Sequence, residues 1–368
     1  MIKVCHLASN HSQDDTRIFH KECSSLAKHG YEVHFVVAGT TGIQNDVFIE
    51  GETLKKKNRL WRMFFFSRHI YKRAKSLNAD IYHIHDPELL RYATRLKKKD
   101  NIVIFDSHEN MVGAIGEKAY IPKIIRPLIK SLYEKYQKDV CKKIDAVITA
   151  TPNMTEYFKQ FKETVIDVMN YPILADVIHK SSFDKTLVYA GNFSKQWNLI
   201  HAVNALALVP DLKLKLYGNG EKLLPVLEAS PGWKQVEYYG RVPHSEIQKA
   251  LSSATAGIAL LSPGANTDYE NGNFANTKIF EEMMAGLPVI CTNFKRWKEF
   301  VNKYKCGICI TPDDENEIAK AYQYVIDHYS DMDTMGKNGR VAIEKEFNWS
   351  FEEKKLYNLY EYLLKSKS

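Results

Sequence analysis

The stretch Asn273-Phe-Ala-Asn-Thr-Lys-Ile-Phe-Glu-Glu-Met-Met-Ala-Gly-Leu-Pro-Val-Ile290 places a polar loop, a helix and a buried strand in direct succession. Lys278 opens a run of good helix formers, Gly286 tolerates the positive φ of a helix C-terminus, and Pro288 prevents continuation. The first turn of such a helix offers unpaired amides and the positive end of the helix dipole, which together favour a phosphate. Glu281 follows in that helix, where its carboxylate can reach the vicinal hydroxyls of a ribose.

The run from Lys278 to Ile290 resembles the nucleotide-sugar signature of family-4 retaining glycosyltransferases with the GT-B fold. In that family two glutamates eight positions apart flank the loop and the helix. Glu281 matches the second, which implies that it holds the nucleotide ribose. The first falls at position 273, where this chain has Asn273, and an amide still accepts a hydrogen bond but brings no negative charge. The alternative is an ordinary helix–strand unit of an α/β domain with incidental polar residues.

Both halves of the chain alternate strand-like runs with helical stretches, which is the pattern of doubly wound parallel sheets. With the resemblance, this predicts an α/β protein of the GT-B class, with two Rossmann-like domains facing a deep interdomain cleft. The strand-like runs are 3–7, 32–37, 81–84, 102–105 and 146–149 in the first half, and 186–190, 212–217, 236–239, 256–260, 289–291 and 307–310 in the second.

The expected division is an N-terminal acceptor-binding domain over 1–168 and a C-terminal nucleotide-sugar-binding domain over 169–345. The resemblance implies that a closing helix over 346–368 packs back on the N-terminal domain. The extended segment 165–172 and the polar stretch 180–184 are the predicted linker.

The amino-acid composition limits the kinds of protein that this chain can be. The 368 residues are 45% hydrophobic and 26% charged, as in a soluble globular protein. No apolar run is long enough to span a bilayer, and the first residues read as a strand and not a signal peptide. Six scattered cysteines suit a reducing compartment, so a cytoplasmic location is expected. A lone Cys306-Gly-Ile-Cys309 pair suits a buried strand edge better than a zinc or redox site.

Segment 55–73 interleaves basic and aromatic residues within a chain of net charge +7. Three interpretations remain open: a surface helix whose aromatics pack inward, an anionic membrane surface, and, least favoured, a nucleic-acid patch. We predict that the protein associates peripherally with the inner face of the cell membrane and does not bind nucleic acid.

Polar loops follow three of the N-terminal strands, at 9–19, 85–88 and 106–110. Carboxyl ends of parallel strands meet at one edge, where open α/β sheets bind ligands, so these loops are expected to converge. The resemblance implies that His108 contacts the donor sugar near the reacting bond, and the alternative is a histidine that stabilises its loop. None of these loops has the GxGxxG spacing of nicotinamide or flavin enzymes.

The same loops supply the predicted acceptor-binding residues, each with a structural alternative. An aspartate ahead of Thr16 suits a helix N-cap, and an aspartate ahead of Pro87 commonly shapes a loop through bonds to backbone amides. The predicted acceptor-binding residues are Asp14, Asp15, Arg17, His85 and Asp86.

The turn after 186–190 lacks the cations that the resemblance leads one to expect. The family pattern is a glycine and an arginine followed five positions later by a lysine, and the two cations neutralise the leaving diphosphate. Here the cationic positions hold Asn192 and Trp197, so Lys195, Arg241 and Lys278 are the candidate replacements. The predicted catalytic group is His108, Lys195 and Glu281. The predicted donor-binding residues are Gly191, Asn192, Arg241, Asn273, Phe274, Ala275, Asn276, Thr277, Lys278 and Glu281.

These observations predict a glycosyltransferase of the hexosyltransferase type. It would move a sugar from a nucleotide-diphosphate sugar to the hydroxyl of a glycan or lipid-linked acceptor, in bacterial surface polysaccharide or glycolipid assembly. Retention at the anomeric carbon is implied by the resemblance. A UDP-sugar is favoured over a GDP-sugar as donor, and neither a metal nor another cofactor is expected. The rivals are a GT-B nucleotide-sugar epimerase and a non-catalytic sugar- or nucleotide-binding protein.

Overall fold

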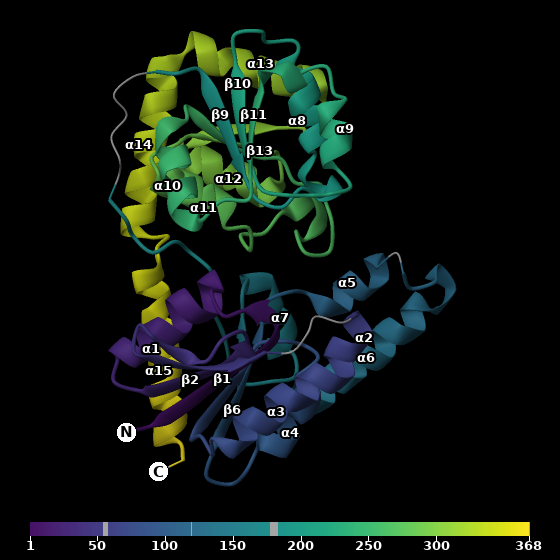
Figure 1. The fold of residues 1–368 in the computed structure, drawn as a ribbon, viewed down its shortest axis with the longest axis vertical. Coiled ribbons are helices and arrows are strands. Elements are labelled where there is room, and N and C mark those ends of the chain that lie inside the picture. Colours follow the sequence, from purple (N-terminus) through teal and green to yellow (C-terminus); the bar gives the residue numbers. More distant parts are fainter. Residues whose placement is uncertain (54–57, 119, 177–182, 368) are drawn as a thin grey trace. The chain divides into compact units, whose positions relative to one another are not determined.

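The computed structural model describes residues 1–53, 58–118, 120–176 and 183–367 and contains two compact units (Figure 1). Unit 1 comprises Met1–Asn170 and Trp349–Ser368, and unit 2 comprises Tyr171–Asn348. The divisions therefore follow Asn170 and Asn348, where the sequence led us to expect them after positions 168 and 345. Residues 180–182 of the expected linker, and 55–57 of the basic segment, lie outside the described residues.

Unit 1 is built on an eight-stranded sheet of order β3-β4-β2-β1-β5-β6-β7-β8, parallel except for the β3–β4 pair. The five expected strands are confirmed, and three further strands were missed, two of which have only three residues. β3 and β4 form a hairpin whose two turn residues, Asn45 and Asp46, both have positive φ, as a tight primed turn requires. The strands are β1 (Lys3–Ser12), β2 (Glu32–Ala38), β3 (Gly42–Gln44), β4 (Val47–Glu52), β5 (Ile81–Ile84), β6 (Ile102–Ser107), β7 (Ala146–Thr149) and β8 (Val165–Asp167).

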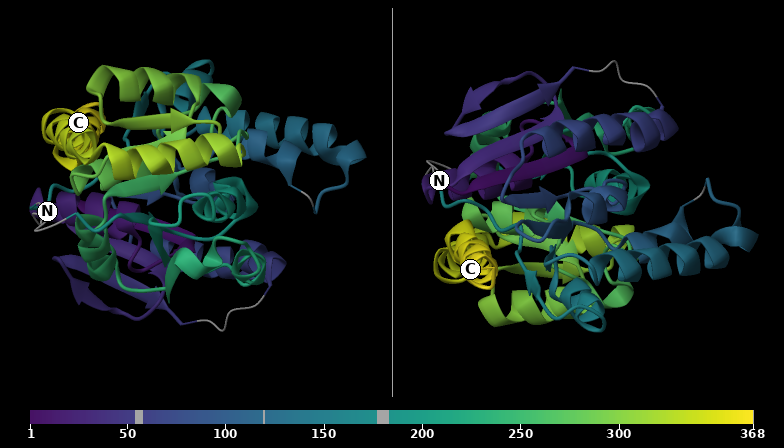
Figure 2. Two further views of the ribbon diagram at one scale, coloured as in Figure 1. Left: turned by 90° about the horizontal axis from the view of Figure 1, so that it is seen from above. Right: turned by 90° about the horizontal axis from the view of Figure 1, so that it is seen from below.

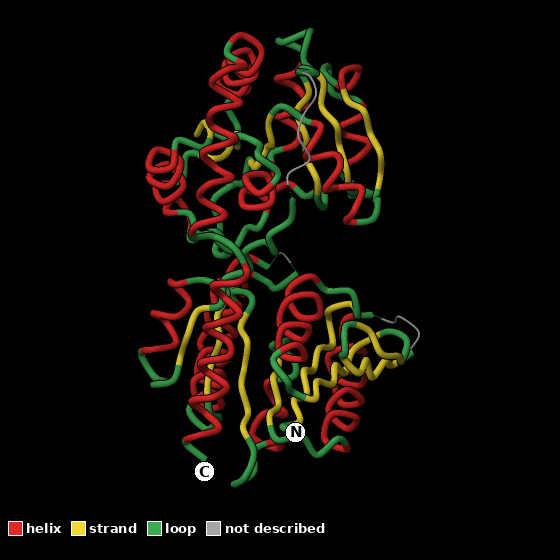
Figure 3. Tube along the Cα trace, turned by 90° about the vertical axis from the view of Figure 1, so that its left-hand side faces the viewer, coloured by secondary structure: helices red, strands yellow, loops and turns green. Residues whose placement is uncertain are grey.

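Helices cover both faces of this sheet (Figure 3). They are η1 (Thr16–Cys23), α1 (Ser24–Lys28), α2 (Arg59–Trp61), η2 (Arg62–Phe66), α3 (Ser67–Ser76), η3 (Leu90–Tyr92), α4 (Ala93–Leu96), α5 (Met111–Glu117), η4 (Lys123–Ile125), α6 (Arg126–Cys141), α7 (Pro152–Lys159) and α15 (Trp349–Lys365). Figure 2 shows α5 and the start of α6 extending away from the sheet. None of the helices within the described ranges is both long and apolar enough to cross a membrane.

The last helix, α15, supplies part of the unit 1 core. Leu356, Tyr360 and Leu363 pack with residues of β1, η1 and β2 in one buried cluster. The indole nitrogen of Trp349 donates to the Ser25 hydroxyl (2.8 Å), so polar contacts fix the start of the helix as well. Alternate residues of each strand contact this cluster, while those between them face α3, α4 and α7 on the other side.

The basic-aromatic segment has one face in the core and one outside. Phe66 and Ile70 are buried, whereas Phe64 and Phe65 are exposed. The prediction that the aromatics pack inward is therefore right for one face only.

Unit 2 contains a six-stranded parallel sheet of order β11-β10-β9-β12-β13-β14, and all six strands match the sequence prediction. Cys309 lies in the edge strand β14, which confirms the strand-edge interpretation of the CxxC pair. The strands are β9 (Thr186–Ala190), β10 (Lys213–Tyr217), β11 (Val236–Gly240), β12 (Ala256–Ala259), β13 (Val289–Thr292) and β14 (Gly307–Ile310). The helices are η5 (Lys195–Trp197), α8 (Leu199–Leu206), α9 (Leu224–Glu228), η6 (Trp233–Gln235), α10 (His244–Ser253), η7 (Tyr269–Asn271), α11 (Lys278–Met284), α12 (Lys295–Tyr304), α13 (Glu315–Asp327) and α14 (Tyr329–Lys345).

Candidate functional site

The loop–helix–strand motif of unit 2 folds as predicted, with α11 beginning at Lys278 and ending before Gly286, whose φ is +74°. The amides ahead of the helix are less available than expected. The Ala275 amide donates to Asn273 Oδ1 (3.1 Å), and the Lys278 amide donates to Asn276 Oδ1 (3.0 Å). Side chains of the loop itself thus satisfy two of the donors that were expected to meet a phosphate.

Asn273 is part of the loop scaffold. Its side chain is 6% exposed and donates to the Asn266 carbonyl (2.8 Å), and its own carbonyl accepts from the Trp297 indole (2.7 Å). Because its amide oxygen already accepts from Ala275, the side chain is committed on both atoms. Asn273 thus has a structural role in the loop, and its expected contact with a donor sugar stays a prediction.

Phe274 also points into the protein and not toward a ligand. Its ring lies 5.8 Å from the ring of Phe280 and 5.1 Å from that of Phe300, within an aromatic cluster of unit 2. These contacts hold the ring of Phe274, and its expected place in the donor-binding loop stays a prediction.

Lys278 extends from α11 to the carboxyl end of β9. Its ammonium donates to the Ala190 carbonyl and lies 4.6 Å from the centre of the Tyr189 ring and 4.8 Å from that of Trp197. A Cβ at Gly191 would meet this ammonium, so a larger residue there would displace the end of the lysine side chain. Trp197, which occupies a position where the resemblance leads one to expect a cation, therefore binds a cation from α11 through its ring face.

Burial lowers the pKa of Lys278 below its usual value, while the negative charges of Glu281 and Glu282 act in the opposite direction. Glu282 is itself buried, and burial raises the pKa of its carboxyl well above the ordinary range. The ammonium of Lys278 is thus poorly solvated and close to the carboxyl group of Glu282. Because water screens it little, the ammonium would strongly attract an additional anion.

The other predicted donor residues are more dispersed. Asn192, Lys195 and Arg241 are exposed, and Arg241 follows β11, two strands away from β9. Partly exposed residues surround the start of α11: Ala275, Asn276, Thr277 and Glu281. The structure therefore brings Gly191, Trp197 and Lys278 together, and leaves Lys195 and Arg241 outside that group.

In unit 1, the predicted polar loops converge at the carboxyl ends of β1, β5 and β6, but several of their side chains hold the loops together. The Asp86 carboxylate accepts from the amides of Ser9 (2.6 Å) and Asn10 (2.9 Å) and is almost fully buried. Asp86 thus bonds to backbone amides near the end of β1, in line with the structural alternative of a loop-shaping aspartate, and is not a free acceptor-binding group.

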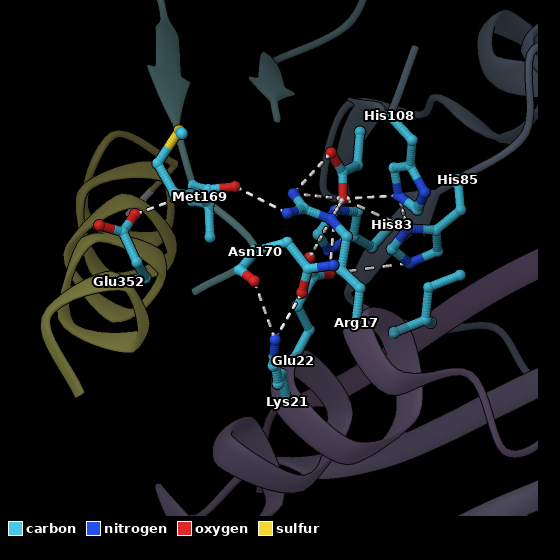
Figure 4. Close-up of polar contacts among 12 residues, drawn as sticks. Arg17, Lys21, Glu22, His83, His85, His108, Met169, Asn170 and Glu352 are labelled. Atoms are coloured by element: carbon cyan, nitrogen blue, oxygen red, sulfur yellow. Dashed lines mark hydrogen bonds and ion pairs between the residues drawn. The ribbon is translucent and has the colours of Figure 1, made fainter. Parts of the chain in front are cut away.

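Arg17 is the largest departure from the predicted acceptor site. Its side chain is 5% exposed, its Nε and Nη2 donate to Asp106 (3.2 and 3.1 Å), and its Nη1 donates to the Val168 carbonyl (2.7 Å), as Figure 4 shows. In addition, Glu22 Oε1 lies 3.0 Å from Arg17 Nε. Every nitrogen of the guanidinium faces a protein acceptor, so Arg17 is a buried structural charge and does not offer a free donor to an acceptor sugar.

Asp15 acts as the N-cap of η1. Its Oδ1 accepts from the amides of Arg17 and Ile18 (both 2.9 Å), and its Oδ2 lies 2.8 Å from His11 Nδ1. The capping alternative for this aspartate is therefore confirmed. Asp14 is exposed.

His108 is held by its neighbours in one orientation. Its Nε2 lies 3.0 Å from Asp106 Oδ2 and 3.1 Å from His85 Nδ1 (Figure 4). Burial alone would raise the pKa of Asp106, but the charges of Arg17 and His108 hold it well below the usual range. An ionised carboxylate only accepts hydrogen bonds, so His108 carries a proton on Nε2, and its Nδ1 is the acceptor when the ring is neutral.

His85 is fully buried between His108 and a second histidine. Its Nε2 lies 2.9 Å from His6 Nδ1, and burial lowers the pKa of His85 to about 4, so the ring is neutral. A buried ring of this kind cannot touch an acceptor, which corrects the prediction for His85.

The sequence interpretation missed His6, Glu22, His83 and Tyr360, which surround His85 in the same buried network. A signal for one of them exists: His83 stands two positions before His85, at the end of a largely apolar strand, so the two side chains share one face of the sheet. Glu22 and Tyr360 lie in helical stretches whose partners are far along the chain, and no local pattern marks them.

We expect His11 to keep its proton above the ordinary histidine pKa of about 6.5. Burial lowers the pKa of His11, but the hydrogen bond to Asp15 and the charge of Asp86 outweigh it and raise the pKa overall. The stabilisation from His11 is therefore complete below about pH 6.5 and is lost as the pH rises through the higher folded-state value. An NMR titration of the ring should show this, and Asp15→Asn should lower the midpoint. Asp14→Asn is the matched control; equal shifts in both variants would contradict the assignment.

Two family models match the chain: residues 16–170 match "Glycosyltransferase Family 4", and residues 184–328 match "Glycosyl transferases group 1". Among solved structures, sucrose-phosphate synthase from Thermosynechococcus elongatus is 16% identical, with 100% of both chains covered and a TM-score of 0.78. HepE from Anabaena, solved with UDP and glucose, is 13% identical over 98% of this chain and 100% of its own, with a TM-score of 0.73.

WaaG, a glycosyltransferase involved in lipopolysaccharide biosynthesis, is 12% identical over 96% of this chain and 98% of its own, with a TM-score of 0.68. At such identities the likeness shows the fold alone, which confirms the expected class of two parallel-sheet α/β domains of the GT-B type. The comparison with curated proteins gives no significant match.

Proposed function

Because this chain carries a Glycosyltransferase Family 4 domain followed by a Glycosyl transferases group 1 domain, we propose that it transfers a sugar from a nucleotide-diphosphate sugar to an acceptor hydroxyl. The observation that carries the proposal is the ammonium of Lys278 at the turn after β9. Cleavage of a sugar–phosphate bond leaves negative charge on the diphosphate, and a fixed cation stabilises that charge as it develops. Asn192 and Trp197 cannot supply it, whereas Lys278 meets the same turn.

In the proposed donor site Glu281 binds the ribose, and the nucleotide is uridine diphosphate. Glu281 lies in α11 three residues after Lys278 and is partly exposed, so its carboxylate is free to accept from ribose hydroxyls while the ammonium holds the diphosphate. A UDP-sugar is the favoured donor, because HepE, which shares the fold, was solved with UDP and glucose.

The proposed reaction proceeds with retention of the anomeric configuration. The bond between the anomeric carbon and the donor phosphate breaks, and the acceptor oxygen bonds to the same face of the sugar. The acceptor proton passes to the departing phosphate, so the step needs no protein nucleophile. Lys278 would balance the charge left on the diphosphate, and His108, by resemblance, would contact the donor sugar through the unprotonated Nδ1.

Incubation with a panel of UDP- and GDP-sugars, with and without simple glycan acceptors, tests this function. Release of free nucleoside diphosphate together with a new glycosidic product supports transfer. An isomerised donor would instead identify an epimerase, and tight binding without turnover would identify a binding protein.

Replacement of Glu281 by alanine tests the ribose contact. We expect UDP affinity to fall by about tenfold or more, since one hydrogen bond to a charged group contributes about 1.5–3 kcal/mol. Glu299→Ala, an exposed glutamate on the neighbouring helix α12, is the matched control. Unchanged UDP affinity in Glu281→Ala would reject the ribose role. Isothermal titration calorimetry measures both.

A lipid-linked acceptor is proposed on the evidence of an apolar surface on unit 1. It is formed by exposed side chains of α2, η2, η4, α6 and the turn before η4: Leu60, Phe64, Phe65, Tyr120, Ile124, Ile125, Leu128 and Leu132. Ile124 in η4 is 90% exposed, and Leu128 and Leu132, four residues apart in α6, share one face of that helix. The Arg59 guanidinium lies 4.6 Å above the Tyr120 ring and joins the two segments.

Basic residues border this apolar surface, which suits an anionic bilayer better than a neutral one. Lys123 is the neighbour of Ile124 in η4, Lys135 lies three residues after Leu132 in α6, and both are exposed. Not all the basic residues of segment 55–73 are free, because Arg62 pairs with Glu88 (3.0 Å) and Arg73 pairs with Glu50. We propose peripheral binding at the inner face of the cell membrane, in glycolipid or surface polysaccharide assembly; WaaG, of similar fold, is involved in lipopolysaccharide biosynthesis.

The double variant Ile124→Glu/Leu128→Glu should no longer sediment with vesicles of mixed phosphatidylglycerol and phosphatidylcholine. Each substitution removes apolar area from the interface and adds a charge that anionic lipid repels. The control is Leu208→Glu, which changes an equally exposed leucine of unit 2. Binding that survives the double substitution, or that is equal on pure phosphatidylcholine, would contradict the proposal.

A further inference from the structure

Four metal-ligating side chains meet in the interior of unit 1, and we call them the His3Glu cluster: His6, Glu22, His83 and His85. They come from β1, η1 and the end of β5, and all are fully buried. His6 pairs with His83 across neighbouring strands, and His85 follows two residues later, so the three rings project from one face of the sheet. One ligand atom from each member lies within 4.8 Å of the others.

The spacing of the ligand atoms is close to that of a four-coordinate site. His6 Nδ1 lies 2.9 Å from His85 Nε2, and Glu22 Oε2 lies 3.9 Å from both His83 Nε2 and His85 Nε2. With bonds of about 2.0–2.1 Å and tetrahedral angles, neighbouring ligand atoms of zinc are about 3.4 Å apart. Each of these three distances therefore differs from the ideal by about 0.5 Å, which small side-chain shifts can correct.

Two members carry polar atoms that point into the cluster without a partner. His83 Nε2 and Glu22 Oε2 are completely buried, and across the described ranges they have no hydrogen bond. Glu22 Oε1, the other carboxylate oxygen, lies beside Arg17 at ion-pair distance but without hydrogen-bond geometry. Buried polar atoms left unsatisfied are costly and call for a bound group, and a cation at the centre would engage both atoms at once.

The outer nitrogens of the same rings are oriented by neighbouring polar groups. His83 Nδ1 lies 2.8 Å from the Tyr360 hydroxyl, and His6 Nε2 lies 3.5 Å from the same oxygen. His85 Nδ1 lies 3.4 Å from Asp106 Oδ2. Metal-binding histidines characteristically direct the other ring nitrogen to a carboxylate, hydroxyl or carbonyl, which fixes the tautomer and the ring orientation.

We propose that unit 1 binds one divalent transition-metal ion, with zinc as the best match, through His6 Nδ1, His83 Nε2, His85 Nε2 and Glu22 Oε2. Imidazole and carboxylate ligands suit zinc, and four protein ligands leave no open position, so the ion has a structural and not a catalytic role. It links β1, β5 and η1. This reverses the expectation of a metal-free protein, and it does not depend on the proposed glycosyltransferase activity.

Metal analysis of the refolded chain tests the proposal. Because the cluster is closed to solvent, the ion must enter during folding, so the protein is unfolded in denaturant with a chelator, desalted, and refolded with Zn²⁺ or with Co²⁺. About one zinc per chain is expected to remain after gel filtration, as four protein ligands define a single site. The cobalt form should show the visible absorption of a four-coordinate nitrogen and oxygen site.

Variants separate this site from other histidines. Glu22→Gln and His83→Gln should retain less than about a tenth of the zinc. His34→Gln should retain all of it, since His34 is a largely buried histidine of β2 that lies between Glu32 and Glu50 and outside the cluster. A wild-type chain that refolds in Zn²⁺ and contains none overturns the proposal, as does equal loss in the His34→Gln control. If the cluster variants do not refold, the wild-type cobalt spectrum decides: its absence overturns the proposal, and its presence supports it.

Discussion

Replacement of Lys278 by methionine should lower the affinity for UDP by about ten- to a hundredfold, the equivalent of one lost hydrogen bond to a charged group of about 1.5–3 kcal/mol. Methionine keeps much of the length and apolar contact of the lysine stem, so the loss isolates the charge. The ammonium is also the group that approaches Gly191 and the ring of Trp197, so the variant removes the cation from the turn after β9. Titration calorimetry with UDP measures the change.

Two observations distinguish this effect from damage to the fold. Lys195→Met, which removes the exposed lysine of η5, should leave UDP affinity nearly unchanged. Since burial lowers the pKa of Lys278, wild-type affinity should also fall as the pH rises, at a pH below that of an ordinary lysine, and the variant should not show this dependence. A larger loss of UDP affinity in Lys195→Met than in Lys278→Met would show that Lys195, and not Lys278, binds the diphosphate. Equal melting temperatures of variant and wild type are required before affinities are compared.

Replacement of Arg17 by methionine should cost unit 1 about 3–5 kcal/mol of unfolding free energy, the usual penalty for leaving one partner of a buried ion pair alone. Among the described residues, Arg17 is the one arginine or lysine that bonds to Asp106, and Asp106 is completely buried. The variant would leave that carboxylate without an arginine, beside histidines and the Glu22 carboxyl group. Urea unfolding followed by circular dichroism provides the measurement.

Arg62→Met is the matched control for Arg17→Met. Arg62 also makes a two-point contact with a carboxylate, that of Glu88, at 3.0 and 3.1 Å, but its side chain is partly exposed. Exposed ion pairs contribute up to about 1 kcal/mol, so this variant should unfold close to the wild type. If the two variants were equally destabilised, burial would not be the cause of the effect of Arg17.

The strands were predictable because each carries its own signal. Buried parallel strands are short apolar runs between turn residues, and such runs identify all six strands of unit 2 and five of the eight in unit 1. The strands that were missed, β3, β4 and β8, include two of only three residues, too short for a periodic pattern. The start of α11 at Lys278 and its end before Gly286 were also predictable, because residues next to each boundary mark it.

The candidate site was predictable in position but not in the roles of its side chains. Arg17, Asp86 and Asn273 lie in the loops that the pattern indicated, yet each is committed to a partner within the protein. Arg17 binds a carboxylate 89 residues away, and Asp86 binds an amide 77 residues away. Only the tertiary fold decides such pairings, and a sequence shows the residue type without its partner. The Lys278–Trp197 contact is a similar case, since it joins α11 to η5, which lie far apart in the sequence.

The participation of α15 in the unit 1 core has a consequence for synthesis of the chain on the ribosome. Five residues of α15 fill a cluster whose other buried members lie within the first 170 residues: Trp349, Leu356, Leu359, Tyr360 and Leu363. The nascent N-terminal segment must therefore wait, with that apolar face uncovered, while all of unit 2 emerges and has time to fold first. Chaperone dependence during translation is thus expected for the N-terminal half, and synthesis that stops at Asn348 would release a chain prone to aggregation.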